Sequence, residues 1–382
     1  MEFIYCDQAA SSFPKPRQVV EAVKRALTET SASAGRSAHR MSLKAARLVF
    51  DARETLAGFL GAEDSSRIAF THNVTQALNM VLFGFLRPGD HVLTSSMEHN
   101  SVMRPLNWLG KNRHVKVEVV PSSIAGELDP AEFEKRLTDR TRLVIVNHAS
   151  NVTGGISPLT GIKTAIDQVP LLVDAAQSAG VLPLDVQNGP ADILAFTGHK
   201  SLLGPTGTGG LWIAPELDID PLLRGGTGSR SELEEHPDFM PDRLEAGTQN
   251  THGLAGLAAG VKFIKEVGLD KIRAHELDLT RHFLNGLTGI KTVTVYGPPD
   301  ADSRVAVVSI NLKGWSPSDL AHILNRDFGI MTRAGLHCAP RAHRTLRTFP
   351  QGTVRFSFGF FNTKAEIDTV LSALDDLSRR AT

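Results

Sequence analysis

The 382-residue sequence is poor in cysteine: it has only Cys6 and Cys338. So few thiols in so long a chain argue against a disulfide framework and favour a reducing compartment, so we expect a cytoplasmic protein. Neither cysteine has a second one nearby, which makes a thiolate zinc site unexpected. The 14 histidines leave a histidine site open on count alone, but no spacing indicates one, and we predict no metal.

The sequence also lacks an excess of charge and a long apolar run. Lys+Arg and Asp+Glu both number 41, so the formal net charge is zero. A neutral chain has no overall electrostatic footprint for nucleic acid or an acidic membrane, although one local anion site stays possible. No apolar run approaches the ~18–20 residues that cross a bilayer. The N-terminus lacks the basic and apolar segments of a signal peptide. We therefore expect neither nucleic acid nor membrane as a partner.

What is present is a regular alternation of apolar strands and helical stretches, which predicts an α/β fold with a mostly parallel sheet covered on both faces. In such sheets ligands bind beyond the carboxyl ends of the strands. Strands are expected at 67–71, 90–95, 115–120, 142–148, 170–174, 191–197 and 209–213, and helices at 74–86, 100–110, 130–138 and 160–168.

The pattern changes after about residue 258, and the length suits a large domain plus a smaller one. A long helical stretch at 259–287 precedes expected strands at 292–296, 304–312 and 353–359, with a helix at 317–328. We predict a large domain over 16–257. We predict a smaller α+β domain formed by 1–15 and 258–382.

Two charged residues follow neighbouring apolar strands of the large domain. Lys200 comes directly after the strand at 191–197, and a desolvated lysine there can form a Schiff base. Asp174 ends the strand at 170–174, and a carboxylate at that edge can keep a pyridine nitrogen protonated. A surface lysine and a helix N-cap aspartate are the plainer alternatives. Together the two residues favour a pyridoxal 5′-phosphate (PLP) site.

Other polar residues follow the same strand ends. His99 is suited to stack on a flat ring and move protons, or it simply begins a helix. Asn151 follows the strand at 142–148, although it also reads as a loop residue. Thr75 lies in the first turn of a helix, where free N–H groups favour a phosphate, unless Asn73 and Thr75 only cap that helix.

Two residues of the second domain are reactive or charged in unusual places. Arg355 interrupts an apolar strand and needs a partner, which is either a substrate carboxylate or a structural ion pair. Cys338 lies in a glycine-containing loop beside His337 and near Arg333, surroundings that favour a nucleophilic thiolate. The alternative for a free cysteine is burial as a small apolar residue, and we expect that for Cys6.

In the order and spacing of these motifs, nearly end to end, the chain resembles the class V aminotransferase-like PLP enzymes and, within them, the cysteine desulfurases. The short loop around Cys338 resembles their compact-loop branch. The segments that carry the resemblance are Tyr5–Ala10, Thr71–Thr75, Glu98–Asn100, Ser150–Gly154, Val173–Ser178, Thr197–Lys200, Glu245–Asn250, Arg333–Cys338 and Val354–Ser357.

The resemblance implies a fold-type I PLP transferase that acts as a homodimer and converts L-cysteine to L-alanine. It implies that Lys200 carries the cofactor, Asp174 pairs with its ring nitrogen, Gln177 contacts its phenolic oxygen and His99 stacks on its ring.

The resemblance further implies that the phosphate is held by Thr75, Thr197 and His199, and by Thr248 across the dimer interface. This chain has Asn73-Val74-Thr75 where relatives often have Gly-Thr-Thr, so one phosphate hydroxyl is missing.

For the substrate, the resemblance implies that Asn151 and Arg355 hold the carboxylate. Cys338 attacks the sulfur and becomes a persulfide, which a sulfur-acceptor protein then discharges. His39 matches an active-site histidine of the family less closely.

Three alternatives stay open. A selenocysteine lyase acting on L-selenocysteine would share every motif. A class V aminotransferase would have no need of Cys338. An inactive homologue that serves as a binding partner is disfavoured by the presence of Lys200, Asp174 and Cys338. The sulfur acceptor and the pathway served, such as iron–sulfur cluster assembly, are not determined by the sequence.

Overall fold

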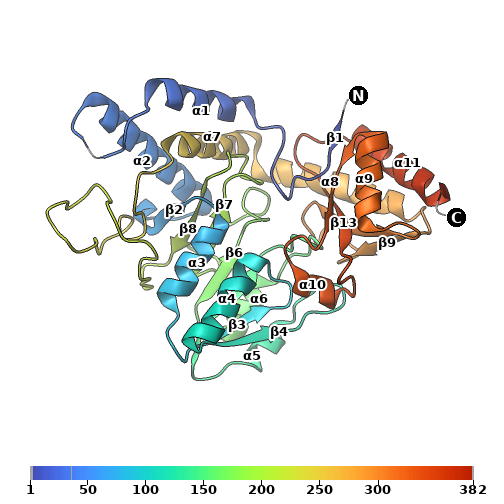
Figure 1. Cartoon of the computed structure of the whole chain (residues 1–382), viewed down its shortest axis with the longest axis horizontal. Helices are drawn as coiled ribbons and strands as arrows, with labels where there is room; N and C mark the ends of the chain where they lie inside the picture. Colours follow the sequence, from blue (N-terminus) through green and yellow to red (C-terminus); the bar gives the residue numbers. More distant parts are fainter. Residues whose placement is uncertain (1–2, 36, 381–382) are drawn as a thin grey trace.

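A computed structural model of the chain describes residues 3–35 and 37–380. The fold consists of a seven-stranded sheet between two layers of helices and a smaller four-stranded sheet with its own helices (Figure 1). The ends of the expected domains at 1–2 and 381–382 lie outside the described residues.

The large sheet is parallel except for one strand. β8 runs antiparallel to both of its neighbours, and the remaining pairs are parallel. The expected mostly parallel sheet is confirmed. In spatial order the strands are β2 (Ile68–Thr71), β8 (Gly209–Ile213), β7 (Ile193–Thr197), β6 (Leu171–Asp174), β5 (Thr141–Asn147), β3 (His91–Ser95) and β4 (Lys116–Val120).

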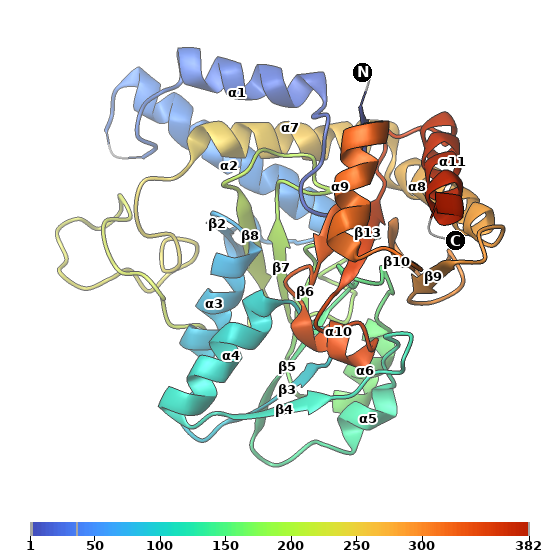
Figure 2. The same cartoon turned by 45° about the vertical axis from the view of Figure 1, so that its right-hand side comes forward.

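The two faces of this sheet bury different helices, because successive side chains of a strand point to opposite faces. In β5, Val144 and Val146 join one core, while Leu143 and Ile145 join the other. The first core is covered by α2 (Arg40–Leu60), α5 (Pro130–Glu134), α6 (Leu159–Ile166) and α7 (Thr251–Val267). The second is covered by α3 (Val74–Phe85) and α4 (Asn100–Arg113). α1 (Arg17–Glu29) packs outside, on α7 (Figures 1 and 2).

The smaller sheet is antiparallel and has a core of its own. Its strands, in spatial order, are β12 (Arg333–Gly335), β13 (Thr353–Ser357), β10 (Val307–Leu312) and β9 (Val293–Tyr296). Its core is covered by α8 (Leu269–Leu287), α9 (Pro317–Phe328) and α11 (Lys364–Arg380). The N-terminal β1 (Ile4–Tyr5) pairs with β11 (Ile330–Met331), so the start of the chain lies against this part. The short α10 (Pro340–Thr345) follows Cys338.

The structure corrects several expected boundaries. The helix expected at 130–138 ends at Glu134, and the strand expected from residue 304 begins only at Val307. The helical stretch after 258 is two helices, which meet at Gly268 with a left-handed φ of 94°. Because α7 runs through residue 258 and packs on the large sheet, we propose Gly268 as the division between the domains. Within the described residues, no helix is long and apolar enough to span a membrane.

Candidate active site

The centre of the site lies where two neighbouring strands, β6 and β7, end. Asp174 is the last residue of β6, and Lys200 follows β7 by three residues. Burial lowers the pKa of Lys200 to about 8, although Asp174 opposes this shift. Burial raises the pKa of Asp174, opposed by the Ala176 N–H at 2.9 Å and by Lys200. The pair therefore combines an amine that is easily neutral with a carboxylate that favours a cationic partner.

Beside Lys200, two buried polar atoms have no hydrogen-bond partner within the described residues: Thr197 Oγ1 and His199 Nδ1. Burial, and secondly the charge of Lys200, lowers the pKa of His199 to about 4. Buried polar atoms are normally paired, so these two indicate a ligand with hydrogen-bonding groups. Gln177 also lies here, and its amide donates to the Ala9 carbonyl at 3.1 Å.

The first turn of α3 has exposed polar residues. Asn73 caps this helix, because its side chain accepts from the Gln76 N–H at 3.0 Å, so the plainer alternative is correct for Asn73. Thr75, two residues after Asn73, is exposed. Its position in the first turn leaves it among free backbone N–H groups, as an anion site requires.

His99 both begins a helix and faces the cationic centre. Its Nδ1 accepts from the Ser101 N–H at 3.0 Å, so α4 is capped by this ring. Burial, followed by the charges of Lys200 and Arg333, lowers its pKa to about 4. The ring is therefore neutral at pH 7, and since Nδ1 is an acceptor, its proton lies on Nε2.

Glu98 was not among the predicted site residues, although it lies in the same motif as His99. Its carboxyl is fully buried, accepts from the Ser95 hydroxyl at 2.5 Å and from the Asn147 N–H at 3.1 Å, and leaves Oε2 unpaired within the described chain. Burial raises its pKa to about 8. The sequence could have indicated Glu98, because it is a charged residue directly before a histidine that begins a helix.

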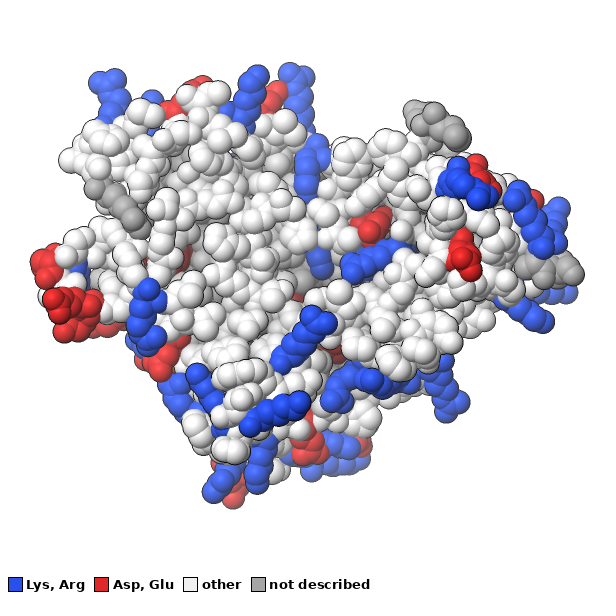
Figure 3. Space-filling model, viewed as in Figure 1, with Lys and Arg blue, Asp and Glu red and all other residues white. Residues whose placement is uncertain are grey.

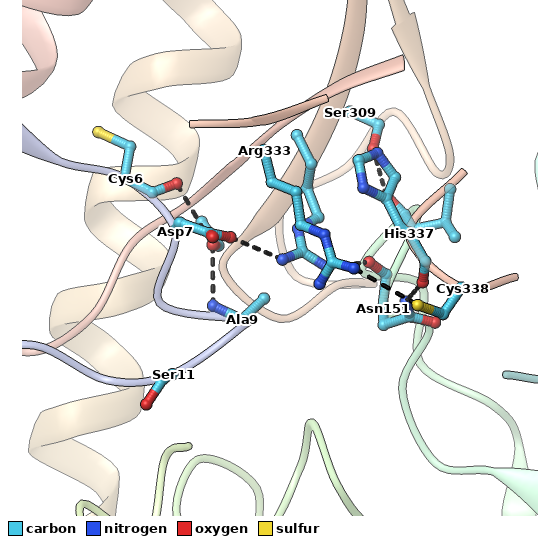
Figure 4. A network of polar contacts seen from close by, with 12 residues as sticks. Cys6, Asp7, Ala9, Ser11, Asn151, Ser309, Arg333, His337 and Cys338 are labelled. Atoms are coloured by element: carbon cyan, nitrogen blue, oxygen red, sulfur yellow. Dashed lines mark hydrogen bonds and ion pairs between the residues drawn. The ribbon is translucent and has the colours of Figure 1, made fainter. Parts of the chain in front are cut away.

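The smaller domain contributes a connected polar network (Figure 4). Arg355 is 1% exposed; its Nη2 pairs with Asp7 at 2.7 Å and its Nη1 donates to the Asn151 carbonyl at 3.0 Å. The Asn151 amide in turn donates to the His337 carbonyl at 2.6 Å. The ion-pair alternative for Arg355 is thus present, while its buried Nε has no partner among the described residues.

Cys338 is exposed, and the Arg333 guanidinium donates to its sulfur at 3.4 Å. The Cys338 carbonyl accepts from the Asn100 N–H at 2.7 Å, so this residue lies against the start of α4, next to His99. The neighbouring His337 does not face the thiol as a cation: its ring is buried, pairs with Thr353, and burial lowers its pKa to about 2. The expectation that His337 helps to ionise the thiol is therefore wrong, and Arg333 is the charge at the sulfur. Cys6 is fully buried, as expected.

Two predicted site residues, His39 and Thr248, do not lie beside Lys200 within a single chain. His39 is exposed and caps α2, where its ring accepts from the Ser42 N–H at 3.3 Å. Thr248 is exposed and lines a small cavity with His72 and Gln76, not with Lys200. Within the described residues, no cluster of three or more His, Cys, Asp or Glu side chains is arranged to hold a metal ion.

Comparison with known proteins agrees with this geometry. Residues 4–370 match the family described as aminotransferase class-V. The chain belongs to the class V aminotransferase family. The expected α/β fold of that family is confirmed.

Individual class V relatives are similar over almost the whole chain. A probable cysteine desulfurase of Pyrococcus abyssi is 37% identical over 98% of this chain and 94% of its own length. A cysteine desulfurase of Haloferax volcanii is 32% identical over 97% of this chain and 88% of its own. The apo structure of a cysteine desulfurase from Thermococcus onnurineus superposes with a TM-score of 0.92 at 35% identity, covering 99% of this chain and 95% of the other.

Class V enzymes depend on PLP, and the residues present fit that cofactor. Lys200 offers an amine with a lowered pKa, and Asp174 offers a buried carboxyl that a protonated ring nitrogen would satisfy. The unpaired Thr197 Oγ1 and His199 Nδ1 offer polar atoms to a phosphate. The chain is a PLP-dependent enzyme.

Proposed function

We propose that this class V enzyme is a cysteine desulfurase, which converts L-cysteine to L-alanine and transfers the sulfur to Cys338. One observation carries the proposal: Cys338 has an exposed thiol that the Arg333 guanidinium contacts at 3.4 Å, and its carbonyl accepts from Asn100, next to His99 of the cofactor site. An aminotransferase needs the lysine but has no use for a thiol there.

The residues around the cofactor have distinct roles. PLP, when bound, withdraws electrons from the substrate's α-carbon. Lys200 would hold the cofactor through its amine and would accept the substrate's α-proton. Asp174 would keep the ring nitrogen protonated, Gln177 would bind the phenolic oxygen, and the neutral His99, with its proton on Nε2, would lie against the ring.

Thr75, Thr197 and His199 would hold the phosphate. Asn151 and Arg355 would bind the substrate carboxylate, and Asp7 is the anion that pairs with Arg355 in the structure.

The sulfur transfer is a nucleophilic displacement on sulfur. The Cys338 thiolate forms a bond to the substrate sulfur while the substrate's Cβ–S bond breaks, and the electron pair of that bond passes to carbon. Protonation of that carbon gives alanine. One cysteine and one thiolate thus yield one alanine and one persulfide, with no external oxidant or reductant.

The enzyme is proposed to be a homodimer, because Thr248 and His39 are exposed and do not join the site around Lys200 within a single chain. In a dimer, Thr248 of one chain would contact the phosphate bound to the other, and His39 would join the substrate side. The glycine-rich segment 224–230 would accompany Thr248. Mixing inactive Lys200→Ala and Thr248→Val chains should restore part of the activity through hybrid dimers, whereas full activity in a monomer would contradict the proposal.

The partner that removes the persulfide is proposed to be a sulfur-acceptor protein with an acidic surface. In Figure 3, Lys and Arg side chains gather over α4 and α10. These two helices flank Cys338 and have no acidic residue. Within the described residues, none of their basic side chains forms an ion pair; they are Arg104, Lys111, Arg113, Arg341 and Arg344.

The deciding experiment is turnover of L-cysteine by the purified enzyme with PLP and dithiothreitol. With dithiothreitol, which reduces the persulfide, equal amounts of alanine and sulfide are expected. Without it, a single turnover should leave one added sulfur on the peptide that contains Cys338. Turnover of L-selenocysteine alone would assign the enzyme as a selenocysteine lyase, and amino transfer to a keto acid without sulfide would assign an aminotransferase. No reaction of a PLP-loaded chain with any of these substrates would favour an inactive homologue.

A further inference from the structure

The backbone at the nucleophile is strained. His337 and Cys338 both have left-handed conformations, with φ of 47° and 58°. Side-chain-bearing residues adopt this region rarely, and two in succession persist only where surrounding contacts impose them.

The contacts that impose this conformation come from three sides. The Asn151 amide donates to the His337 carbonyl at 2.6 Å, and the Asn100 N–H donates to the Cys338 carbonyl at 2.7 Å. Both carbonyls of the strained pair are thus held by the large domain. Both contacts hold backbone carbonyls, and neither of them holds a side chain of the loop.

The third contact is the buried ring of His337. The residue is 2% exposed, and its Nε2 lies 3.0 Å from the Thr353 hydroxyl. Its ring centre lies 5.4 Å from that of His343, which is itself held by the Thr348 hydroxyl at 2.7 Å. Figure 4 shows the His337 ring pointing away from the sulfur of Cys338.

We propose that His337 and Thr353 are positioning residues for the sulfur-transfer step. Thr353 and Arg355 are two residues apart on β13, so their side chains point to the same face of the strand. The strand therefore holds the proposed carboxylate clamp with one side chain and the nucleophile's neighbour with the other. Because Thr353 holds His337, the neighbour of Cys338, and Arg355 would hold the substrate, a single strand sets the distance between the substrate and the thiol.

This inference rests on the proposed function for its catalytic consequence, but its structural part is independent of it. A neutral ring with one proton forms one directed bond to Thr353, and that bond orients the loop. With it, the thiol stays within reach of the Arg333 guanidinium, which lies 3.4 Å from the sulfur. Without it, the loop keeps its two backbone contacts but loses the side-chain hydrogen bond that orients it.

The test compares Thr353→Val, which keeps the shape and removes the hydroxyl, with Thr353→Ser, which keeps the hydroxyl. Alkylation of the cofactor-free chain by iodoacetamide reports on Cys338 alone, because Cys6 is fully buried. Loss of one hydrogen bond is expected to slow alkylation by about fivefold in Thr353→Val and by less than about twofold in Thr353→Ser. Thermal melts check that both variants are folded.

With PLP bound, single-turnover persulfide formation should fall by about tenfold in Thr353→Val, while the KM for L-cysteine and the spectral change on cysteine binding stay as in the wild type. His337→Gln and His337→Met form a second pair, in which only glutamine can bond to Thr353. Equal alkylation and persulfide rates in valine and serine variants would overturn the proposal. If the wild type forms no persulfide but the two Thr353 variants still differ in their alkylation rates, the proposed function is refuted and the positioning role stays supported.

Discussion

The two halves of the site are built by opposite means. In the large domain, Asp174 and Lys200 follow regular strands, and burial shifts the pKa of both. In the smaller domain, the reactive group is an exposed thiol on a strained loop, held by hydrogen bonds. The first half uses desolvation to adjust charge, and the second uses backbone geometry to place an atom. Proton transfer therefore requires that the chain adjust the charge of a group, whereas sulfur transfer requires that it place an atom.

The largest effect should follow from removing the base of the first half. Lys200→Ala should abolish PLP attachment and all turnover, because Lys200 supplies the buried amine that follows β7, while the neighbouring Lys15 amine is already bound by the His199 carbonyl at 2.8 Å and the Ser12 hydroxyl at 2.6 Å. The absorption band of the attached cofactor should vanish while the melting temperature of the cofactor-free chain changes little. A variant that keeps the band would show that another group binds PLP.

Removing the nucleophile should separate the two halves. Cys338→Ser should stop alanine formation from L-cysteine, since an alcohol is neither soft nor ionised at neutral pH. The spectral change on cysteine binding should persist, because that step needs only the Lys200 half. Absorption spectra and alanine assays on the same samples measure both. Undiminished alanine formation would mean that Cys338 is not the acceptor.

Replacing the buried arginine tests where the halves meet. In Arg355→Lys a point charge replaces a bidentate fork, so the KM for L-cysteine should rise by about tenfold or more. The ion pair between Arg355 and Asp7 would also be weakened, so some thermal stability should be lost. Steady-state kinetics and melting curves distinguish the roles: a lower melting temperature with unchanged KM would assign Arg355 to the ion pair alone.

The buried carboxyl of Glu98 should make the first half sensitive to pH. Its folded-state pKa of about 8 exceeds its ordinary value of 4.5. A raised pKa stabilises the fold at low pH, and this contribution is lost as the pH rises through 8. Glu98→Gln should therefore melt several degrees above the wild type at pH 9 but not at pH 5. A constant difference across this range would contradict the assignment.

The smallest effect should come from the second cysteine. Cys6→Ala removes one buried sulfur from the core of the smaller domain, and burial raises the pKa of this thiol further above its ordinary range. Turnover should stay within about twofold, with a modest loss of stability from the small cavity. Mass spectrometry of the wild type after cysteine treatment should find no added sulfur on Cys6.

Much of the first half was predictable because strand ends are local features. Apolar runs located β6 and β7, and the polar residues that follow them meet at one sheet edge whenever the strands are parallel neighbours. The helices α1 and α2 were not predicted, although α1 has a clear amphipathic period. The resemblance to class V enzymes supplied the roles of Gln177, Thr248 and His39, which no local pattern indicated.

By itself, the sequence determined the alternating sheet, the lysine and aspartate at its edge, and the presence of a thiol beside Arg333. The tertiary structure was needed to show that His337 turns into the core, that Asp7 pairs with Arg355, and that Glu98 is fully buried. These outcomes depend on segments that are far apart in the chain, and the desolvation and hydrogen bonds that decide them exist only once those segments have packed together within each domain.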